Sequence, residues 1–310
     1  MEIDYELTLD RCKELMPELH GHAIEITELK GGITNKLYRV RAEPEYDYVV
    51  RIYGQKTEMF IDREIEMRTM KLIEPLEISP KVMHYLPDKQ ITVIEYIDAY
   101  TLKNPDFLKQ GLWELIVQPI RIVHESGLSV DKVFHPLVEI KRMNGILKEL
   151  NADFPEFPIA ETIRRLEKID GIASLTPNDY VLCHNDLLAE NFLLLNERER
   201  SDSPMYLIDW EYAGMGYRYY ELADMFQEIL VPRDVELKLM ELYYRGEDLD
   251  RNVYMTDLFK PFPDIFWFLW SLVQKTVSTI EFDYYTYGKI KFENAQGNMK
   301  RLVDEYGLTL

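Results

Sequence analysis

His184-Asn185-Asp186-Leu187-Leu188-Ala189-Glu190-Asn191 is the stretch of this 310-residue chain that decides its fold. It has the form His-x-Asp-x4-Asn, and a further acid, Asp209, follows the apolar run Tyr206-Leu207-Ile208. Apolar segments border the loop on both sides, at 180–183 and 192–196, and both are predicted as short strands. Such strands would hold the polar residues between them in fixed positions. The sequence therefore predicts a rigid polar loop, with a third strand at 205–208 delivering Asp209 beside it.

The residue types in this loop suit the transfer of a phosphoryl group from a nucleotide. That reaction needs a carboxylate to orient the attacking hydroxyl, and oxygen ligands for the Mg²⁺ that neutralises the phosphates. Asp186 is the candidate catalytic base, whereas Asn191 and Asp209 are candidate Mg²⁺ ligands, in the order that protein kinases use. His184 is expected to brace the loop rather than to act on substrate. The alternative is that all of these residues are loop caps and turn residues.

The chain changes character near residue 97. Before this point, strands are predicted at 24–30, 37–41, 46–53, 81–86 and 90–96, with helices at 5–20 and 61–73. Beyond residue 104, helices are predicted at 106–126, 135–150, 159–170, 218–230, 234–245, 262–281 and 287–305. We therefore predict an α+β, bilobal protein kinase-like fold. It would have a small antiparallel-sheet N-terminal lobe for nucleotide (1–97), a hinge (98–103) and a larger, mainly helical C-terminal lobe for catalysis and substrate (104–310).

The N-terminal lobe offers candidate contacts to ATP. Gly31-Gly32-Ile33-Thr34-Asn35 joins two strands, and glycine in such a turn lets backbone N–H groups approach phosphate oxygens. Gly32, Thr34 and Asn35 are therefore candidate phosphate contacts, although two adjacent glycines also mark ordinary turns. Glu95 and Ile97 lie at the end of the last strand before the hinge, where adenine would bind, and this assignment rests on position alone.

Arg51, in the third strand, is the candidate cation for the α- and β-phosphates. A cation at this position normally pairs with a carboxylate on the following helix. Arginine keeps its charge and carries a forked set of donors, so it can bridge a phosphate and a carboxylate together. Glu64 is the candidate partner, with Glu66 and Glu58 as rivals. The alternative is that all three acids are surface charges.

The composition disfavours several classes of partner. Asp and Glu number 55 against 36 for Lys and Arg, and the net charge of −19 disfavours nucleic acid and anionic lipid. Cys12 and Cys183 provide no disulfide framework and fit a reducing compartment. The N-terminus lacks the apolar core of a signal peptide, and the most apolar run, 265–273, is too short to span a bilayer. We therefore expect a cytoplasmic protein without membrane insertion; a homodimer is compatible with the sequence.

Longer stretches around these motifs resemble the choline/ethanolamine kinase family. One is the polar loop itself, preceded by Val181-Leu182-Cys183 and followed by Leu207-Ile208-Asp209-Trp210-Glu211-Tyr212-Ala213. Another is Phe266-Trp267-Phe268-Leu269-Trp270-Ser271-Leu272-Val273-Gln274, followed by Ser278-Thr279-Ile280-Glu281-Phe282-Asp283-Tyr284. The glycine loop and Val50-Arg51-Ile52-Tyr53-Gly54 also match, so the similarity covers nearly the whole chain in order.

The resemblance implies a small-molecule kinase that phosphorylates choline or ethanolamine with ATP and Mg²⁺, and phosphocholine is the expected product. It makes Asp186 the catalytic base and Asn191 and Asp209 the Mg²⁺ ligands. Better-known eukaryotic members usually have Gln where this chain has Leu188, so one polar contact near the phosphates or substrate is missing. The resemblance also implies a choline pocket made of Tyr212, Glu228, Trp267, Trp270, Phe282 and Tyr287.

The chemistry of a quaternary ammonium supports this pocket. A trimethylammonium group has no N–H and is bound by aromatic faces, each contributing roughly 0.5–2 kcal/mol. Trp267 and Trp270 are three residues apart and can share one helical face. The alternative for this segment is an ordinary aromatic core. An ethanolamine kinase would need more acceptors for N–H groups, and an aminoglycoside phosphotransferase would need a broad acidic rim. A catalytically inactive binding module would require the loss of Asp186, Asn191 or Asp209, and all three are present.

Overall fold

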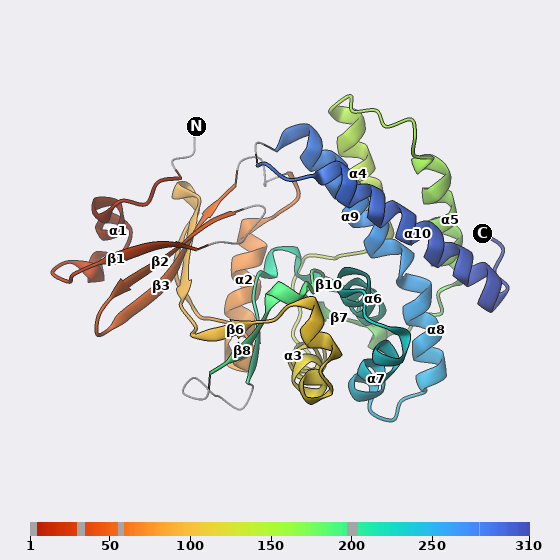
Figure 1. Ribbon diagram of the computed structural model, residues 1–310, viewed down its shortest axis with the longest axis horizontal. Coiled ribbons are helices and arrows are strands. Elements are labelled where there is room, and N and C mark those ends of the chain that lie inside the picture. The colour runs from red at the N-terminus through yellow and green to blue at the C-terminus, as the bar shows by residue number, and fades with distance from the viewer. Residues whose placement is uncertain (1–4, 30–34, 55–58, 197–203, 279) are drawn as a thin grey trace.

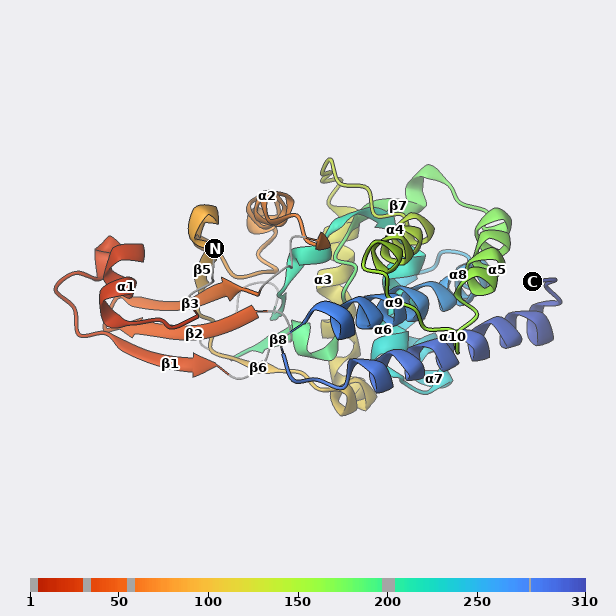
Figure 2. The same cartoon turned by 90° about the horizontal axis from the view of Figure 1, so that it is seen from above.

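Two parts of different architecture lie side by side in the computed structural model, which describes residues 5–29, 35–54, 59–196, 204–278 and 280–310 (Figure 1). An antiparallel sheet forms the N-terminal part, and helices make up most of the C-terminal part. The same division is visible from above in Figure 2. The predicted combination of a small sheet followed by a larger helical part is confirmed.

The N-terminal sheet has five strands in the order β1-β2-β3-β5-β4, and each neighbouring pair is antiparallel. Alternate residues of the inner strands point into a small core in which Val40, Val50 and Val93 are fully buried. Helix α1 (Leu9–Leu15) contributes Cys12 to the same core. The strands are β1 (Glu25–Leu29), β2 (Asn35–Ala42), β3 (Tyr46–Tyr53), β4 (Val82–Leu86) and β5 (Ile91–Glu95).

Helix α2 (Arg63–Ile73) links the sheet to the C-terminal part. Asp62 is its N-cap, and the Asp62 carboxylate accepts hydrogen bonds from the backbone N–H groups of Glu64 and Ile65. The buried side chains of Met70 and Ile73 belong to the large core of the C-terminal part and not to the core of the sheet. Although α2 lies between β3 and β4 in the sequence, it therefore packs on the part that contains the polar loop.

Helices α9 (Pro261–Val277) and α10 (Tyr284–Tyr306) pack along each other in the C-terminal part. Every residue of α9 from Pro261 to Gln274 is buried, as is typical of a core helix. The two helices approach closely at Gly288, where an added Cβ would lie 2.0 Å from Ser271 Oγ. No helix within the described ranges is both long and apolar enough to cross a bilayer. The other α-helices of this part are α3 (Trp113–Glu125), α4 (Pro136–Glu149), α5 (Ile159–Ile172), α6 (Arg218–Ile229), α7 (Arg233–Tyr244) and α8 (Leu249–Phe259).

Two small antiparallel sheets hold the polar loop. The loop connects β7 (Tyr180–Cys183) of one sheet to β8 (Phe192–Leu195), the central strand of the other sheet. Asp209 comes shortly after β9 (Met205–Leu207) of that second sheet, as the sequence predicts. The first strand of this second sheet lies in the predicted hinge, so the hinge is hydrogen-bonded to the C-terminal part. One sheet pairs β7 (Tyr180–Cys183) with β10 (Gly214–Tyr217), and the other has the order β6 (Ala99–Thr101), β8 (Phe192–Leu195), β9 (Met205–Leu207).

The sequence prediction of the elements is wrong in a few places. The helix expected at 5–20 ends at Leu15, because Pro17 disfavours helical geometry in the residue before it. The helix expected at 106–126 begins at Trp113, after two short 3₁₀ turns. Strand β10 was not predicted, since glycines at 214 and 216 lower the strand propensity, and α8 was also not predicted.

Candidate active site

The structure brings the three predicted catalytic residues together. Asn191 Nδ2 donates to the backbone oxygen of Asp186 over 2.8 Å, and the Asn191 carbonyl accepts from the N–H of Ile208 over 3.0 Å. Asp209, the next residue, has a left-handed backbone with φ 70°, which turns the chain sharply after β9. The candidate base and both candidate metal ligands therefore border one small region.

His184 braces this region from the interior, as expected. Its ring is fully buried, its Nε2 donates to the Ile208 carbonyl over 2.9 Å, and its centroid lies 4.6 Å from that of Trp210. Burial lowers the pKa of His184, so the ring is neutral at pH 7. The histidine thus fastens the polar loop to the segment that leads to Asp209.

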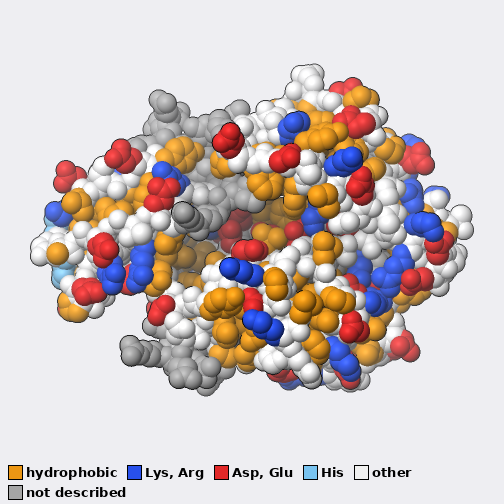
Figure 3. Space-filling view, in the orientation of Figure 1, with side chains coloured by type: hydrophobic (Ala, Val, Ile, Leu, Met, Phe, Trp, Pro, Cys, Tyr) orange, Lys and Arg blue, Asp and Glu red, His pale blue; other side chains and the backbone are white. Residues whose placement is uncertain are grey.

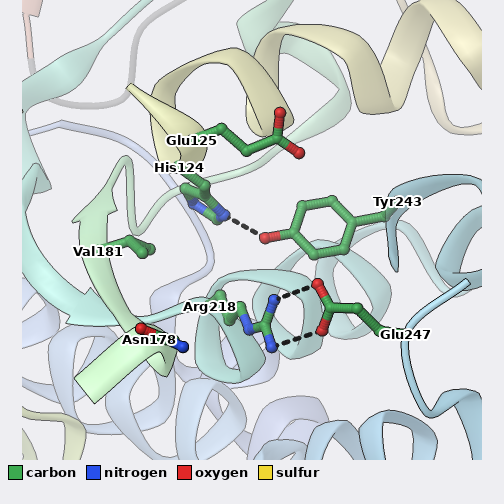
Figure 4. A pocket seen from close by; sticks show the side chains of 7 residues that line it. All are labelled: His124, Glu125, Asn178, Val181, Arg218, Tyr243 and Glu247. Carbon is green, nitrogen blue, oxygen red and sulfur yellow. Dashed lines mark hydrogen bonds and ion pairs between the residues drawn. The ribbon is translucent and has the colours of Figure 1, made fainter. Parts of the chain in front are cut away.

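Glu221 of α6 holds the backbone of the loop from the other side. Its carboxylate accepts from the N–H groups of His184 over 2.8 Å and of Asn185 over 2.6 Å. His124 Nε2 lies 3.3 Å from Glu221, and His124 Nδ1 is hydrogen-bonded to the Tyr243 hydroxyl over 2.5 Å (Figure 4). Although burial opposes it, the hydrogen bond with His124 lowers the pKa of Glu221. The glutamate therefore stays ionised, and its partner His124 lines a cavity of about 230 Å³ together with Tyr243.

Asp186 lies in an acidic and largely dry environment. Only 6% of the residue is exposed, and burial raises the pKa of Asp186 well above its ordinary value. The neighbouring carboxylates, first Asp224 and then Asp209, raise this pKa further. A carboxylate with a raised pKa is a better proton acceptor, which suits a general base.

Arg51 connects the N-terminal sheet to Asp209 and the turn that follows it. Its guanidinium lies 2.7 Å from Glu66 Oε1 and 2.9 Å from Asp209 Oδ1, and it also donates to Glu211. The expected carboxylate partner on α2 is therefore present, but the choice of Glu64 was wrong. Glu64 is exposed and pairs with Arg68, because residues two apart on a helix point about 200° away from each other.

The remaining candidate contacts to nucleotide fall in three places. Gly32 and Thr34 lie outside the described residues, as does Glu58. Asn35, at the start of β2, is buried with its Nδ2 3.4 Å from Glu211 Oε2, so it joins the residues around Arg51. Glu95 and Ile97 lie where β5 leads toward β6, and the Glu95 carboxylate accepts from the backbone N–H of Lys81 over 3.3 Å.

A row of aromatic rings starts at Tyr212, in the turn after Asp209, and continues along α9 and beyond its end. The ring centroids of Tyr212 and Trp267 are 5.2 Å apart, those of Trp267 and Trp270 are 5.8 Å apart, and that of Tyr284 lies 5.9 Å from Trp270. Phe282 extends the row, with its ring 4.9 Å from Tyr284. The two tryptophans thus share a helical face, as their spacing predicts. We call these five residues together with Tyr287, which contacts Phe282, the aromatic wall.

Asp224 connects the aromatic wall to the polar loop. Its Oδ1 accepts from Trp267 Nε1 over 2.8 Å, and its Oδ2 accepts from the backbone N–H of Leu187 over 2.8 Å. The side chain is fully buried, and burial, followed by the charge of Glu228, raises the pKa of Asp224. Because Leu187 follows Asp186 directly, the wall and the candidate base are joined through a single carboxylate.

Glu228 lies beside the wall but is neutralised within the protein. Its Oε1 is 2.6 Å from Lys291 Nζ and 3.4 Å from the Tyr287 hydroxyl. Lys291 is buried and also donates to the Gln227 carbonyl over 2.8 Å. Although burial opposes it, the charge of Glu228 raises the pKa of Lys291, which therefore remains cationic.

In the space-filling view the surface is hollowed between the two parts, with acidic and apolar side chains at the base of the hollow (Figure 3).

Comparison with known proteins assigns this arrangement to a family. The family model described as choline/ethanolamine kinase matches residues 26–237. The chain belongs to the choline/ethanolamine kinase family. It is similar to human ethanolamine kinase 2, with 28% identity over 306 residues that cover 90% of this chain and 77% of the relative. The protein is therefore a phosphotransferase of this family, as the sequence resemblance implies.

Solved structures of choline/ethanolamine kinases have the same fold. A family protein from Mesorhizobium loti matches with a TM-score of 0.79 and 25% identity, covering 96% of this chain and 94% of that one. The choline kinase LicA from Streptococcus pneumoniae matches with a TM-score of 0.78 and 24% identity, covering 94% and 98%. The predicted protein kinase-like fold is thereby confirmed.

The oxygen donors of this kinase fit Mg²⁺. The amide nitrogen of Asn191 is committed to the Asp186 backbone, so Asn191 Oδ1 is the side-chain atom that can ligate a cation. Carboxylate oxygens of Glu66, Asp209 and Glu211 lie within 4.8 Å of one another. A set of hard oxygen donors suits Mg²⁺ better than a softer metal.

Sequence reasoning missed several charged residues of the kinase site. Glu211 contacts Arg51 across the two parts, Asp224 joins wall and loop, and Lys291 neutralises Glu228. A usable signal exists for Asp224, which sits in the apolar run Leu222-Ala223-Asp224-Met225-Phe226. A charge in such a run must be buried with a partner, and buried charges concentrate at functional sites. Tyr284 of the aromatic wall was also missed, although it lies between two residues that were predicted.

Proposed function

We propose that this kinase transfers the γ-phosphoryl group of ATP to the hydroxyl group of choline, forming phosphocholine. The observation that carries the proposal is the pair of hydrogen bonds made by Asp224, one to Trp267 of the aromatic wall and one to the residue after Asp186. A cation seated against the wall would have its hydroxyl, two carbons from the nitrogen, close to the catalytic base.

In the proposed reaction Asp186 accepts a hydrogen bond from the choline hydroxyl. It takes the proton as the new oxygen–phosphorus bond forms and the bond to the β-phosphate oxygen of ADP breaks. The raised pKa of Asp186 favours proton acceptance. Asn191 and Asp209 are the residues that would hold Mg²⁺, which supplies positive charge to the phosphates when bound. Arg51 would add a forked contact to the phosphates.

The charges around the aromatic wall favour choline over ethanolamine. Glu228 is paired with Lys291, and both oxygens of Asp224 already accept hydrogen bonds. The carboxylates next to the wall are therefore engaged by donors of the protein, and the rings are the surface left for a head group. Rings hold a trimethylammonium through cation–π attraction, whereas a primary ammonium also needs acceptors for its three N–H groups.

Ethanolamine is the second candidate acceptor. It is supported by the 28% identity to human ethanolamine kinase 2 and by the acidic surroundings of Asp186, which attract either head group. An aminoglycoside is a poorer candidate because its several ammonium groups would need a broad acidic rim, and the wall consists of rings.

A side-by-side measurement of turnover tests the proposal. ADP release would be followed with choline, ethanolamine and kanamycin, with Asp186→Asn giving the background of nucleotide hydrolysis. We expect kcat/KM for choline to exceed that for ethanolamine by about tenfold or more, as one to two lost cation–π contacts require. A higher kcat/KM for ethanolamine would replace choline as the substrate, and turnover with kanamycin alone would reject both.

A further inference from the structure

Arg63 occupies a point where elements from distant parts of the chain meet. Its Nη1 lies 2.7 Å from Glu66 Oε2 on its own helix and 3.0 Å from Glu211 Oε2, which follows β9. Its Nη2 donates to Asn35 Oδ1 over 3.2 Å, and its guanidinium carbon lies 4.1 Å from the ring centroid of Tyr53. Only 12% of the side chain is exposed. The arginine thus joins α2, two strands of the N-terminal sheet and the turn after Asp209.

Arg51 and Arg63 share two of their partners but differ in the third. Both guanidinium groups contact Glu66 and Glu211, and Arg51 also contacts Asp209 at 2.9 Å. The three carboxylates lie within 4.8 Å of one another, so they repel each other unless cations separate them. Arg51 contacts all three anions, and Arg63 supplies a second cation to two of them, Glu66 and Glu211.

Binding of nucleotide changes what Arg51 and Asp209 must do. Arg51 would share its forked donors between Glu66 and the phosphates, and the Asp209 carboxylate would turn from Arg51 to Mg²⁺. Glu66 and Glu211 would then share Arg51 with the phosphates while staying buried, which is costly unless a second cation remains between them. Arg63 is in contact with both acids and makes no ion pair with Asp209 among the described contacts.

We propose that Arg63 is a positioning residue for ATP, which holds Glu66 and Glu211 together and so leaves donors of Arg51 available to the phosphates and the Asp209 carboxylate available to Mg²⁺. The inference rests on the proposed phosphoryl transfer from ATP. Through Glu211 and Asn35, Arg63 also joins the sheet that carries Arg51 to the turn that follows Asp209. Its effect should therefore fall on nucleotide and not on the amino alcohol.

Arg68 on the same helix provides a matched control. Its side chain is 65% exposed and pairs with Glu64 on the outer surface of α2. Arg63→Gln and Arg68→Gln remove the same charge from the same helix, so a difference between them reports the buried contacts of Arg63. Arg63→Lys keeps the charge but loses the fork that reaches two carboxylates and an amide.

The test measures binding of a non-hydrolysable ATP analogue with Mg²⁺ by calorimetry, together with steady-state kinetics. Arg63→Gln should weaken analogue binding and raise the KM for ATP by about tenfold or more, with the KM for the amino alcohol changed by less than about twofold. Arg63→Lys should fall between, and Arg68→Gln should match the unchanged protein. Equal analogue binding by the Arg63→Gln and Arg68→Gln proteins would overturn the proposal, as would a larger effect on the amino alcohol than on ATP.

A double-mutant cycle separates positioning from a general loss of stability. If Arg63 acts through Glu211, Arg63→Gln should weaken analogue binding much less in a Glu211→Gln background than in the unchanged protein. If the effects of Arg63→Gln and Glu211→Gln on analogue binding are fully additive, in proteins that unfold cooperatively on heating, Arg63 does not act through Glu211 and the proposal is contradicted. Because calorimetry needs no turnover, a protein that phosphorylates neither choline nor ethanolamine would refute the proposed function while still allowing Arg63 to be judged.

Discussion

The proposed nucleotide side of the polar loop is built from ion pairs, whereas the proposed substrate side is built from rings. On the nucleotide side, Arg51 and Arg63 each contact Glu66 and Glu211, and these four residues come from both parts of the molecule. On the proposed substrate side, the ring centroid of Trp267 lies 5.2 Å from that of Tyr212 and 5.8 Å from that of Trp270. Phosphates can compete for cations on the first side, and a cation without N–H groups can be held on the second.

Asp186 and Asp224 lie at the junction of the two sides. The Asp224 carboxylate accepts a hydrogen bond from Trp267 of the aromatic wall. Burial is the largest cause of the raised pKa of Asp186, and the charge of Asp224 is the second. The base is therefore sensitive to residues on either side. Substitutions on one side should change one substrate's kinetics and leave the other's unchanged, whereas substitutions at the junction should change the chemical step.

Removal of the base gives the largest expected effect. Asp186→Asn should lower turnover by about three orders of magnitude or more, because the amide cannot accept the proton. Binding of an ATP analogue, measured by calorimetry, should largely survive. Glu190→Gln, an exposed position in the same loop, is the control and should behave like the unchanged protein. Turnover near the normal level in the Asp186→Asn protein would remove the assignment of the base.

Loss of one ring tests the substrate side alone. Trp270→Ala should raise the KM for choline by one to two orders of magnitude, on the order of 2 kcal/mol, and leave the KM for ATP nearly unchanged. The matched control is Trp113→Ala, since Trp113 lies on α3, where its Nε1 donates to the Phe107 carbonyl, and is not one of the residues of the aromatic wall. An unchanged KM for choline in a folded Trp270→Ala protein would make this residue part of the core only.

Removal of the ion pair between Lys291 and Glu228 tests whether this pairing keeps the Glu228 carboxylate from binding a primary ammonium. Lys291→Met should raise the ratio of kcat/KM for ethanolamine to that for choline by about fivefold, because Glu228 could then accept from a primary ammonium. Lys289→Met, on an exposed position of the same helix, should leave the ratio unchanged. Both proteins would be compared by thermal unfolding, since Glu228 is buried. An unaltered ratio in a folded Lys291→Met protein would contradict the role given to this ion pair.

Substitution of Asp224, at the junction of the two sides, should have a smaller effect, which is a shift in the pH dependence of kcat/KM. Asp186 must be ionised to act, so kcat/KM falls as the pH drops through its pKa, which burial and then Asp224 raise. Asp224→Asn removes the second cause, lowers the pKa of Asp186 and should move the acid limb of the profile to lower pH. The position of the limb, and not the height of the plateau, is the measurement. A limb that moves to higher pH, or stays in place, would show that Asp224 does not act on the base.

The grouping of the aromatic rings could be predicted from the sequence much better than the network of ion pairs around Arg51. The rings of the wall lie mostly within residues 267–287, and the polar loop, Asp209 and the strands around them follow from local patterns. The ion pairs join positions as far apart as Arg51 and Glu211, which are separated by 160 residues. Local pattern could therefore suggest an acid on α2 but could not choose Glu66 over Glu64, nor find Glu211. Strand β10 was missed for a related reason, since its glycines are needed for close packing against the segment at 132–134 and not for strand propensity.

A crystal structure with choline, Mg²⁺ and a non-hydrolysable ATP analogue would test the central claim most directly. The account predicts the trimethylammonium group against Trp267 and Trp270, with the choline hydroxyl within hydrogen-bond distance of Asp186 and facing the γ-phosphate. Choline bound away from these rings, or bound to them with its hydroxyl directed away from Asp186, would contradict it.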